Sequence, residues 1–195
     1  MIKRVRAENI NTKEYLNTNY SGANWRHGWE DADRRIREEI GLAIPQRILD
    51  VGCADGTFIK EFISKSPTTK GYGVDISDAA IERAKENFSE GEFSVGSCYE
   101  LPFEDGFFDL VHSSEMLEHL EEPVKALQEM TRVVKRGGEV VITTVNEHAA
   151  PYEEHLWTWD LKGVLEMVVA AGLVPSLALE KFFNDSILYV KAVKI

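Results

Sequence analysis

The chain has 195 residues, of which 44% are hydrophobic and 28% are charged, and this composition is typical of one globular domain with a full core. Its net charge is −11, from 33 acidic against 22 basic residues, so we expect no nucleic-acid partner, because such binding relies on a basic surface. No apolar run is long enough for a membrane helix, and the first residues lack an apolar secretory segment. These features predict a cytoplasmic protein with no membrane partner.

Residues 1–44 precede the first strand of the predicted core and are expected to form a helical cap. Short helices are predicted at 12–17 and 31–42, and the segment between them is rich in aromatic residues. Two interpretations stay open for this segment, which are a strap packed on the sheet edge and a lid that closes over a ligand. The lid would carry inward the side chains of Tyr15, Tyr20, Trp25, Arg26 and His27. The core would occupy residues 45–195, so that 1–195 is a single domain.

A strand, a tight turn and a helix are predicted next. Residues 48–51 form a short apolar run with β-branched members, which is typical of a buried strand. The chain then turns between Gly52 and Gly56, and apolar residues recur at helical spacing after the turn. Glycines allow a sharp bend and the close approach of a ligand, so this unit is typical of mononucleotide-binding folds.

Strands and helices alternate through the rest of the chain. Further strands are predicted at 70–75, 92–95, 108–112 and 139–145, and helices at 79–88, 123–137 and 160–171. Asp78 is the predicted cap of the first of these helices, and Gly137 the predicted end of the second. Two final strands meet in a hairpin near Asn184. The predicted fold class is therefore α/β, a Rossmann-like doubly wound sheet with helices on both faces, mostly parallel with a C-terminal antiparallel hairpin.

Four ordered segments resemble the class I S-adenosylmethionine-dependent methyltransferases. The segments are ILDVGCADGTF at 48–58, GVDIS at 73–77, GSCYELPFEDGFFDLVHSSEMLEHL at 96–120 and KRGGEVVITTV at 135–145. The closest similarity is to the small-molecule branch, the methyltransferase type 11 and ubiquinone-biosynthesis-like enzymes. This resemblance implies methyl transfer from S-adenosylmethionine to a small-molecule acceptor, at oxygen or nitrogen.

The resemblance also implies which residues bind the cofactor. Gly52 and Cys53 would face its amino acid part, Asp75 would accept the ribose hydroxyls, and adenine would lie near the residues after the second and third strands. Relatives usually have Asp where Ser97 stands and Gly where Ala54 stands, and we expect the Ala54 backbone to tolerate a side chain at little cost. The full expected set is Asp50, Gly52, Cys53, Ala54, Gly56, Asp75, Ile76, Ser97, Cys98, Tyr99 and Ser113.

Catalytic candidates follow the fourth and fifth strands. Glu115, Glu118 and His119 stand at i, i+3 and i+4, so we expect one helical face to carry all three. His119 and His155 are the predicted catalytic residues, since an oxygen acceptor gains from a nearby base. Mixed carboxylate and imidazole groups also suit a divalent ion, and the pattern is similar to the metal site of two O-methyltransferase groups. Many relatives that bind no metal carry the same pattern, so a metal is an alternative but not expected.

Other side chains near these positions are expected to have mainly structural roles. His112 is expected to pack or to line the cofactor site, and at least one of Trp157 and Trp159 to lie in the core. The acceptor would enter between residues 15–29 and 146–159. The alternative function is a non-catalytic methyltransferase-like subunit that binds the cofactor, or merely keeps the fold, and supports a partner. In either case we expect a monomer or homodimer.

Overall fold

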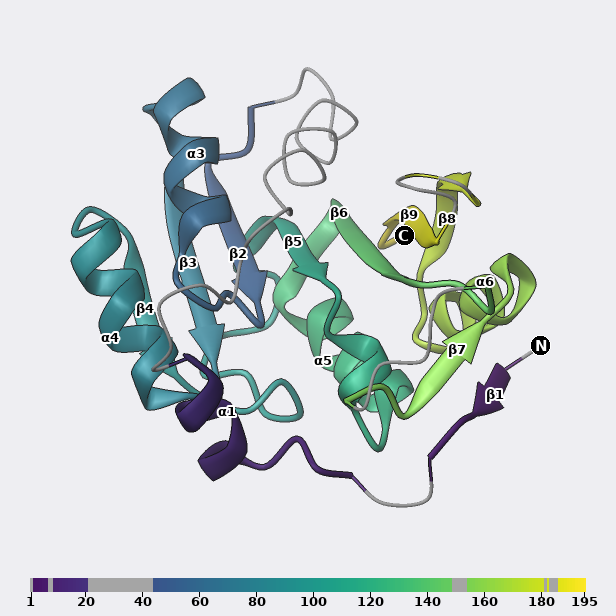
Figure 1. Ribbon diagram of the computed structural model, residues 1–195. Coiled ribbons are helices and arrows are strands. Elements are labelled where there is room, and N and C mark those ends of the chain that lie inside the picture. The colour runs from purple at the N-terminus through teal and green to yellow at the C-terminus, as the bar shows by residue number, and fades with distance from the viewer. Residues whose placement is uncertain (1, 7–8, 21–43, 149–153, 181, 183–185) are drawn as a thin grey trace.

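The computed structural model describes residues 2–6, 9–20, 44–148, 154–180, 182 and 186–195 (Figure 1). The predicted helix at 31–42 and the predicted lid residues Trp25, Arg26 and His27 lie outside the described residues, as does the side chain of Tyr20. None of the helices in the described ranges has the length and apolar character needed to cross a membrane.

A seven-stranded sheet forms the centre of the molecule, with the strand order β4-β3-β2-β5-β6-β9-β8. Five strands are parallel, and the hairpin of the last two pairs antiparallel to them through β6, which confirms the predicted fold class. The strands are β2 (Arg47–Val51), β3 (Lys70–Asp75), β4 (Glu92–Val95), β5 (Phe108–Ser114), β6 (Val134–Val145), β8 (Val174–Leu179) and β9 (Ile187–Val193). Parallel strands all end at one edge of the sheet, called the carboxyl edge below, where open α/β folds bind ligands.

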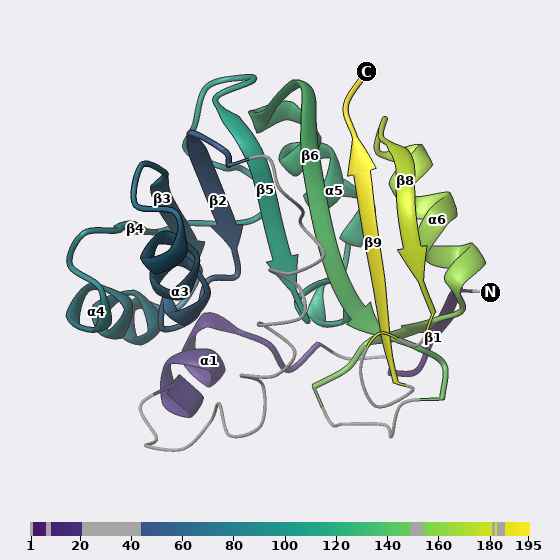
Figure 2. The ribbon, with the colours of Figure 1, turned by 90° about the horizontal axis from the view of Figure 1, so that it is seen from above.

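Helices cover both faces of the sheet (Figure 2). In the part of the chain that the structure describes, α3 (Thr57–Lys65) and α4 (Asp78–Asn87) cover one face, and α5 (Pro123–Val133) and α6 (Leu161–Ala170) cover the other. Because successive strand residues point to opposite faces, Ile48 packs under α3 while Leu49 packs toward α5, and both are fully buried. Burial on both faces explains why β2 is a continuous apolar run and not an alternating one.

Two predicted boundaries are wrong. The helix α5 ends at Val133 instead of continuing to Gly137, and β6 begins at once with Val134 paired to Phe108 of β5. A side chain at Gly138 would lie 2.8 Å from the backbone oxygen of Asp109, so this glycine lets β6 pass close to its neighbour. The cap of α4 is Ser77, whose hydroxyl accepts from the Ala80 amide, and not Asp78.

The N-terminal segment crosses the carboxyl edge of the sheet. Its first strand, β1 (Ile2–Arg4), pairs antiparallel with β7 (Trp157–Trp159), and its helix α1 (Lys13–Tyr20) packs on α4. Trp159 is fully buried, as expected for at least one tryptophan, while the indole nitrogen of Trp157 donates to the Leu120 carbonyl at 2.7 Å. The small sheet was not predicted, because neither three-residue strand has a pattern of its own.

Candidate active site

The turn after β2 has three residues in the left-handed region. Gly52, Ala54 and Gly56 have φ values of +77°, +50° and +72°. A Cβ at Gly52 would lie 3.0 Å from the Met116 sulfur, so Met116 would have to shift by a few tenths of an ångström, and the positive φ at this position favours glycine in addition. The expectation for Ala54 was wrong, because a left-handed conformation costs an L-residue about 1–2 kcal/mol.

Asp75 ends β3 and holds this turn. Its side chain is only 6% exposed, Oδ2 accepts from the Ala54 amide at 3.0 Å, and Oδ1 accepts from the Ser77 amide at 2.9 Å. Burial raises the pKa of this carboxyl, although the two amide hydrogen bonds act in the opposite direction. A carboxylate has about four acceptor positions, so each oxygen can still accept one hydroxyl group.

Two large apolar side chains are exposed next to Asp75. Ile76 follows β3 and is 40% exposed, and Val95 ends β4 directly beside Asp75 and is 42% exposed. Exposed apolar side chains at the carboxyl edge offer a surface on which a flat ring can pack. The sequence analysis did not predict Val95 as a site residue. The signal that could have indicated it is its position as the last apolar residue of the strand, directly before Gly96.

After β4, the hydroxyl groups of Ser97 and Tyr99 form hydrogen bonds within the protein. The Ser97 hydroxyl accepts from the Tyr99 amide at 3.2 Å, and the Tyr99 hydroxyl accepts from the Glu122 amide at the start of α5 at 3.1 Å. Cys98 is half-buried against the core, and burial raises the pKa of its thiol to about 12. Tyr99 therefore directs its hydroxyl to α5, while Ser97 and Cys98 remain beside the strand end.

The other predicted cofactor residues lie beneath the turn. Asp50 is buried with Oδ1 2.7 Å from Nδ1 of His112, whose ring stacks on Phe58 at 3.7 Å between centroids. The Ser113 hydroxyl donates to the Val51 carbonyl at 2.8 Å. Cys53 is a free thiol, 2% exposed, and burial raises its pKa well above the ordinary value. The expected packing of His112 is confirmed. The side chains of Asp50, His112 and Ser113 are buried, and their contacts support the turn after β2.

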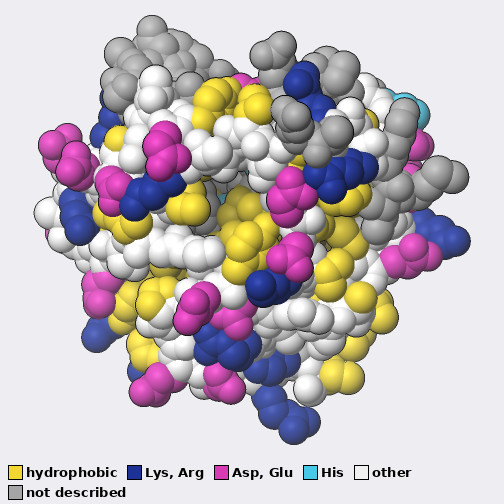
Figure 3. Space-filling view, turned by 90° about the horizontal axis from the view of Figure 1, so that it is seen from below, with side chains coloured by type: hydrophobic (Ala, Val, Ile, Leu, Met, Phe, Trp, Pro, Cys, Tyr) yellow, Lys and Arg dark blue, Asp and Glu magenta, His cyan; other side chains and the backbone are white. Residues whose placement is uncertain are grey.

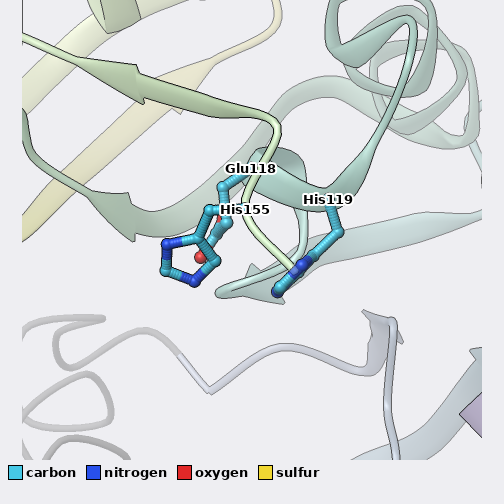
Figure 4. Close-up of side chains that lie close together, drawn as sticks. All are labelled: Glu118, His119 and His155. Atoms are coloured by element: carbon cyan, nitrogen blue, oxygen red, sulfur yellow. The ribbon is translucent and has the colours of Figure 1, made fainter. Parts of the chain in front are cut away.

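A cluster of ionisable side chains lies after β5. One ligand atom from each of Glu118, His119 and His155 lies within 4.8 Å of the others, so the structure brings both predicted catalytic histidines together (Figure 4). The prediction of one helical face was wrong. The helix η1 covers only Leu117–His119. Glu115 lies before it, directly after the end of β5 at Ser114, and its φ of +49° is not helical.

Burial sets the charges in this cluster. It lowers the pKa of His155, which therefore carries a neutral ring near pH 7. Burial also raises the pKa of Glu115, and the neighbouring negative charge of Glu118 raises it further, so Glu115 favours the protonated form. Among the described residues, Oε1 of Glu115 and Oε1 of Glu118 have no hydrogen-bond partner.

The N-terminal segment links the two parts of the site. Near Asp75, Asn17 Oδ1 accepts from the Ser77 hydroxyl at 2.6 Å and from the Ala79 amide at 3.3 Å. Near the cluster, the Tyr15 hydroxyl donates to the Glu154 carboxylate at 2.7 Å. Of the predicted lid side chains, Tyr15 is therefore placed at the carboxyl edge.

A doubly wound sheet with a glycine turn after its first core strand and an acidic residue at the end of the second defines a nucleotide-cofactor enzyme of the class I methyltransferase type. A family model described as a methyltransferase domain matches residues 49–142. A solved S-adenosylmethionine-dependent methyltransferase from Aquifex aeolicus has the same fold, with a TM-score of 0.72 and 20% identity over 84% of this chain and 89% of that chain.

Two curated relatives are similar in sequence. An uncharacterized methyltransferase of Schizosaccharomyces pombe is 40% identical over 105 residues, which are 48% of this chain and 38% of that protein. A ubiquinone/menaquinone biosynthesis C-methyltransferase of Geobacter sp. (strain M21) is 30% identical over 167 residues, which are 80% of this chain and 70% of that protein. The chain belongs to the class I S-adenosylmethionine-dependent methyltransferase family.

Proposed function

We propose that this chain transfers the methyl group of S-adenosylmethionine to a small organic acceptor, at oxygen or nitrogen. The observation that carries the proposal is the buried Asp75 carboxylate, which is held by the Ala54 amide beside the exposed side chain of Ile76. The name of the Geobacter relative also supports a small-molecule acceptor, although it gives carbon as the atom methylated by that protein.

The proposed cofactor position follows from the geometry of the carboxyl edge. The two free acceptor positions of Asp75 match two vicinal ribose hydroxyls, and hydrogen bonds to a charged group are worth about 1.5–3 kcal/mol each. The exposed side chains of Ile76 and Val95 suit an adenine ring, with the Ser97 hydroxyl at its edge. The backbone of Gly52 would then lie beside the amino acid part, because glycine has no side chain of its own to block this approach.

The proposed acceptor position is beside Met116, between the turn and the cluster. The Met116 sulfur lies 3.0 Å from the position that a Cβ of Gly52 would take. Glu118 and His119 follow Met116 two and three residues later, in η1. A sulfonium is already a good leaving group, so holding the acceptor in line with the methyl group supplies much of the rate. The neutral ring of His155 is available to assist in removing a proton from the acceptor.

Titration calorimetry with S-adenosylhomocysteine tests the cofactor site. We expect binding to the wild type and at least tenfold weaker binding to Asp75→Ala, because the ribose loses its two acceptors. Glu82→Ala is the matched control. It removes an exposed carboxylate of α4, and we expect it to bind as the wild type does.

Two results would contradict the proposal. Equal affinity of Asp75→Ala and the wild type would show that the ribose lies elsewhere. A folded wild type that binds no S-adenosylhomocysteine would favour a non-catalytic subunit. The monomer or homodimer expected from the sequence stays a prediction, which sedimentation of the same samples measures.

A further inference from the structure

Glu118, His119 and His155 come from two segments of the chain, and each has one possible ligand atom within 4.8 Å of those of the other two. Glu118 and His119 belong to η1, and His155 lies just before β7. The Leu156 amide donates to the Glu118 carbonyl at 2.7 Å, which fixes the second segment against the first. Figure 4 shows the three side chains close together.

Glu118 has one satisfied oxygen and one open oxygen. The Thr144 hydroxyl donates to Oε2 at 2.8 Å and orients the carboxylate. The residue is 0% exposed, and Oε1 has no hydrogen-bond partner in the part of the chain that the structure describes. A buried carboxylate oxygen without a partner is costly, and a carboxylate oxygen of Glu118 lies within 4.8 Å of a ring nitrogen of each histidine, so a cation held between these groups would compensate it.

The hydrogen bond of His119 fixes its tautomer. Nδ1 lies 3.0 Å from the carbonyl oxygen of Glu154, and because a carbonyl only accepts, Nδ1 carries the proton. The lone pair of Nε2 is therefore available to the cluster. This arrangement, in which one ring nitrogen donates to a backbone carbonyl, is the usual one for a metal-bound histidine.

His155 completes the donor set. Its side chain is 7% exposed, and its ring lies 5.1 Å from the ring of His119 between centroids. Two imidazoles and one carboxylate match the donor set of mononuclear zinc enzymes, which leaves a coordination position open.

We propose that Glu118, His119 and His155 bind one divalent transition-metal ion of the Zn²⁺ type, and that this ion binds the oxygen of a hydroxyl-bearing methyl acceptor. The sequence alone favoured no metal. The second half of the proposal rests on the proposed function and narrows the acceptor to an oxygen compound. A bound cation lowers the pKa of a hydroxyl, so with the ion in place His119 and His155 are ligands, and the cation replaces the assistance in proton removal that the proposed function gives to His155.

The methyl transfer then balances without a further reactant. The hydroxyl proton is released to solvent when the oxygen binds the cation. The oxygen forms a bond to the methyl carbon while the carbon–sulfur bond breaks, and the bonding pair stays on sulfur. The products are the methyl ether of the acceptor, S-adenosylhomocysteine and one proton.

A competing explanation needs no metal. Glu115 and Glu118 can share one proton, which would compensate the buried oxygens of both. The two explanations differ for Glu118→Gln. A shared proton predicts that this substitution keeps or raises stability and that no cation binds in any variant, whereas a metal site predicts loss of a cation that the wild type binds.

The test is a titration of the chelator-treated full chain with Co²⁺ and with Zn²⁺, followed by calorimetry and by the visible absorption of Co²⁺. We expect one ion per chain for the wild type. For Glu118→Gln and for His119→Ala we expect the affinity for the ion to fall by more than the roughly 10- to 100-fold that is typical when a residue hydrogen-bonded to a metal ligand is removed. His148→Ala is the matched control, because His148 is an exposed histidine near the same edge, and we expect it to bind as the wild type does.

The same samples separate this proposal from the proposed function. S-adenosylhomocysteine binding without any cation bound by the wild type would overturn the metal site and leave the methyltransferase intact. Equal cation affinity of the wild type, Glu118→Gln and His119→Ala would also overturn it. Because His119 is half-buried and not in the core, its variant tests the site even if Glu118→Gln fails to fold.

Discussion

Ala54 is the residue at which the turn carries strain. Its φ of +50° is a conformation that favours glycine, yet its amide makes the hydrogen bond to Asp75 that orients the carboxylate. Strain of this kind persists where the surrounding contacts determine the conformation, and here the hydrogen bonds of Gly52 and Cys53 to the Val74 carbonyl do so.

Replacing Ala54 with glycine should therefore stabilise the protein. Relief of the left-handed strain outweighs the greater backbone entropy of glycine, and we expect a gain of up to about 1 kcal/mol, or roughly 2–4 °C in melting temperature. The control is Ala79→Gly on the right-handed backbone of α4, which should lose up to about 1 kcal/mol. A drop in melting temperature for Ala54→Gly, measured by calorimetry, would refute the strain.

The thiol of Cys98 should react slowly in the folded protein. With its pKa raised to about 12, only about one thiol in ten thousand is a thiolate at about pH 8, and the thiolate is the reactive form. Alkylation followed by mass spectrometry should accelerate about tenfold for each unit of rising pH, while the unfolded chain should react at once. Fast labelling of the native protein near neutral pH would show that Cys98 is more accessible than in the structure.

Among the elements, α1 and the residues before it connect the two halves of the site. Asn17 binds the start of α4 directly after Asp75, while Tyr15 binds Glu154 next to the histidine cluster. The helix α1 also carries Lys13, which pairs with Asp78 at 2.8 Å. We infer that this segment acts as a strap over the cofactor and helps to retain it.

Asn17→Ala tests the strap. The substitution removes two hydrogen bonds worth about 0.5–1.5 kcal/mol each, so we expect S-adenosylhomocysteine to dissociate several-fold to about tenfold faster. Stopped-flow displacement measures this rate. Glu14→Ala, which changes an exposed side chain of the same helix, should leave the rate unchanged, and an unchanged rate for Asn17→Ala would make α1 a passive cover.

For the whole molecule, the doubly wound sheet gives two cores, one on each face, with the site at the edge between them. The chain carries a net charge of −11. On the face in Figure 3, basic side chains lie among acidic ones, and hydrophobic side chains gather near the centre. A surface of this kind repels long polyanions but leaves a local ligand site accessible.

We therefore expect no retention of this protein by single- or double-stranded RNA at physiological salt. Phosphate binding depends on the release of counterions by clustered basic residues, and the excess of acidic residues opposes it. Electrophoretic mobility shift at several salt concentrations measures this. A shift that weakens steeply with salt would contradict this expectation.

The sequence alone determined the alternation of strands and helices, the turn at Gly52–Gly56 and the position of Asp75. These features are local, because apolar periodicity and glycine spacing reflect what each segment must bury and where it must bend. The early end of α5 at Val133 could not be predicted in this way, because pairing of Val134 with β5 overrides the helical pattern.

Only the tertiary structure decided what the ionisable residues do. No residue pattern indicated that Asp50 would pair with His112, that the Tyr99 hydroxyl would reach α5, or that the buried carboxylate of Glu118 would lie close to two histidines. Each of these depends on a neighbour that is distant in the chain. Burial and hydrogen bonding at such contacts set charge and tautomer, and neither can be read from one segment alone.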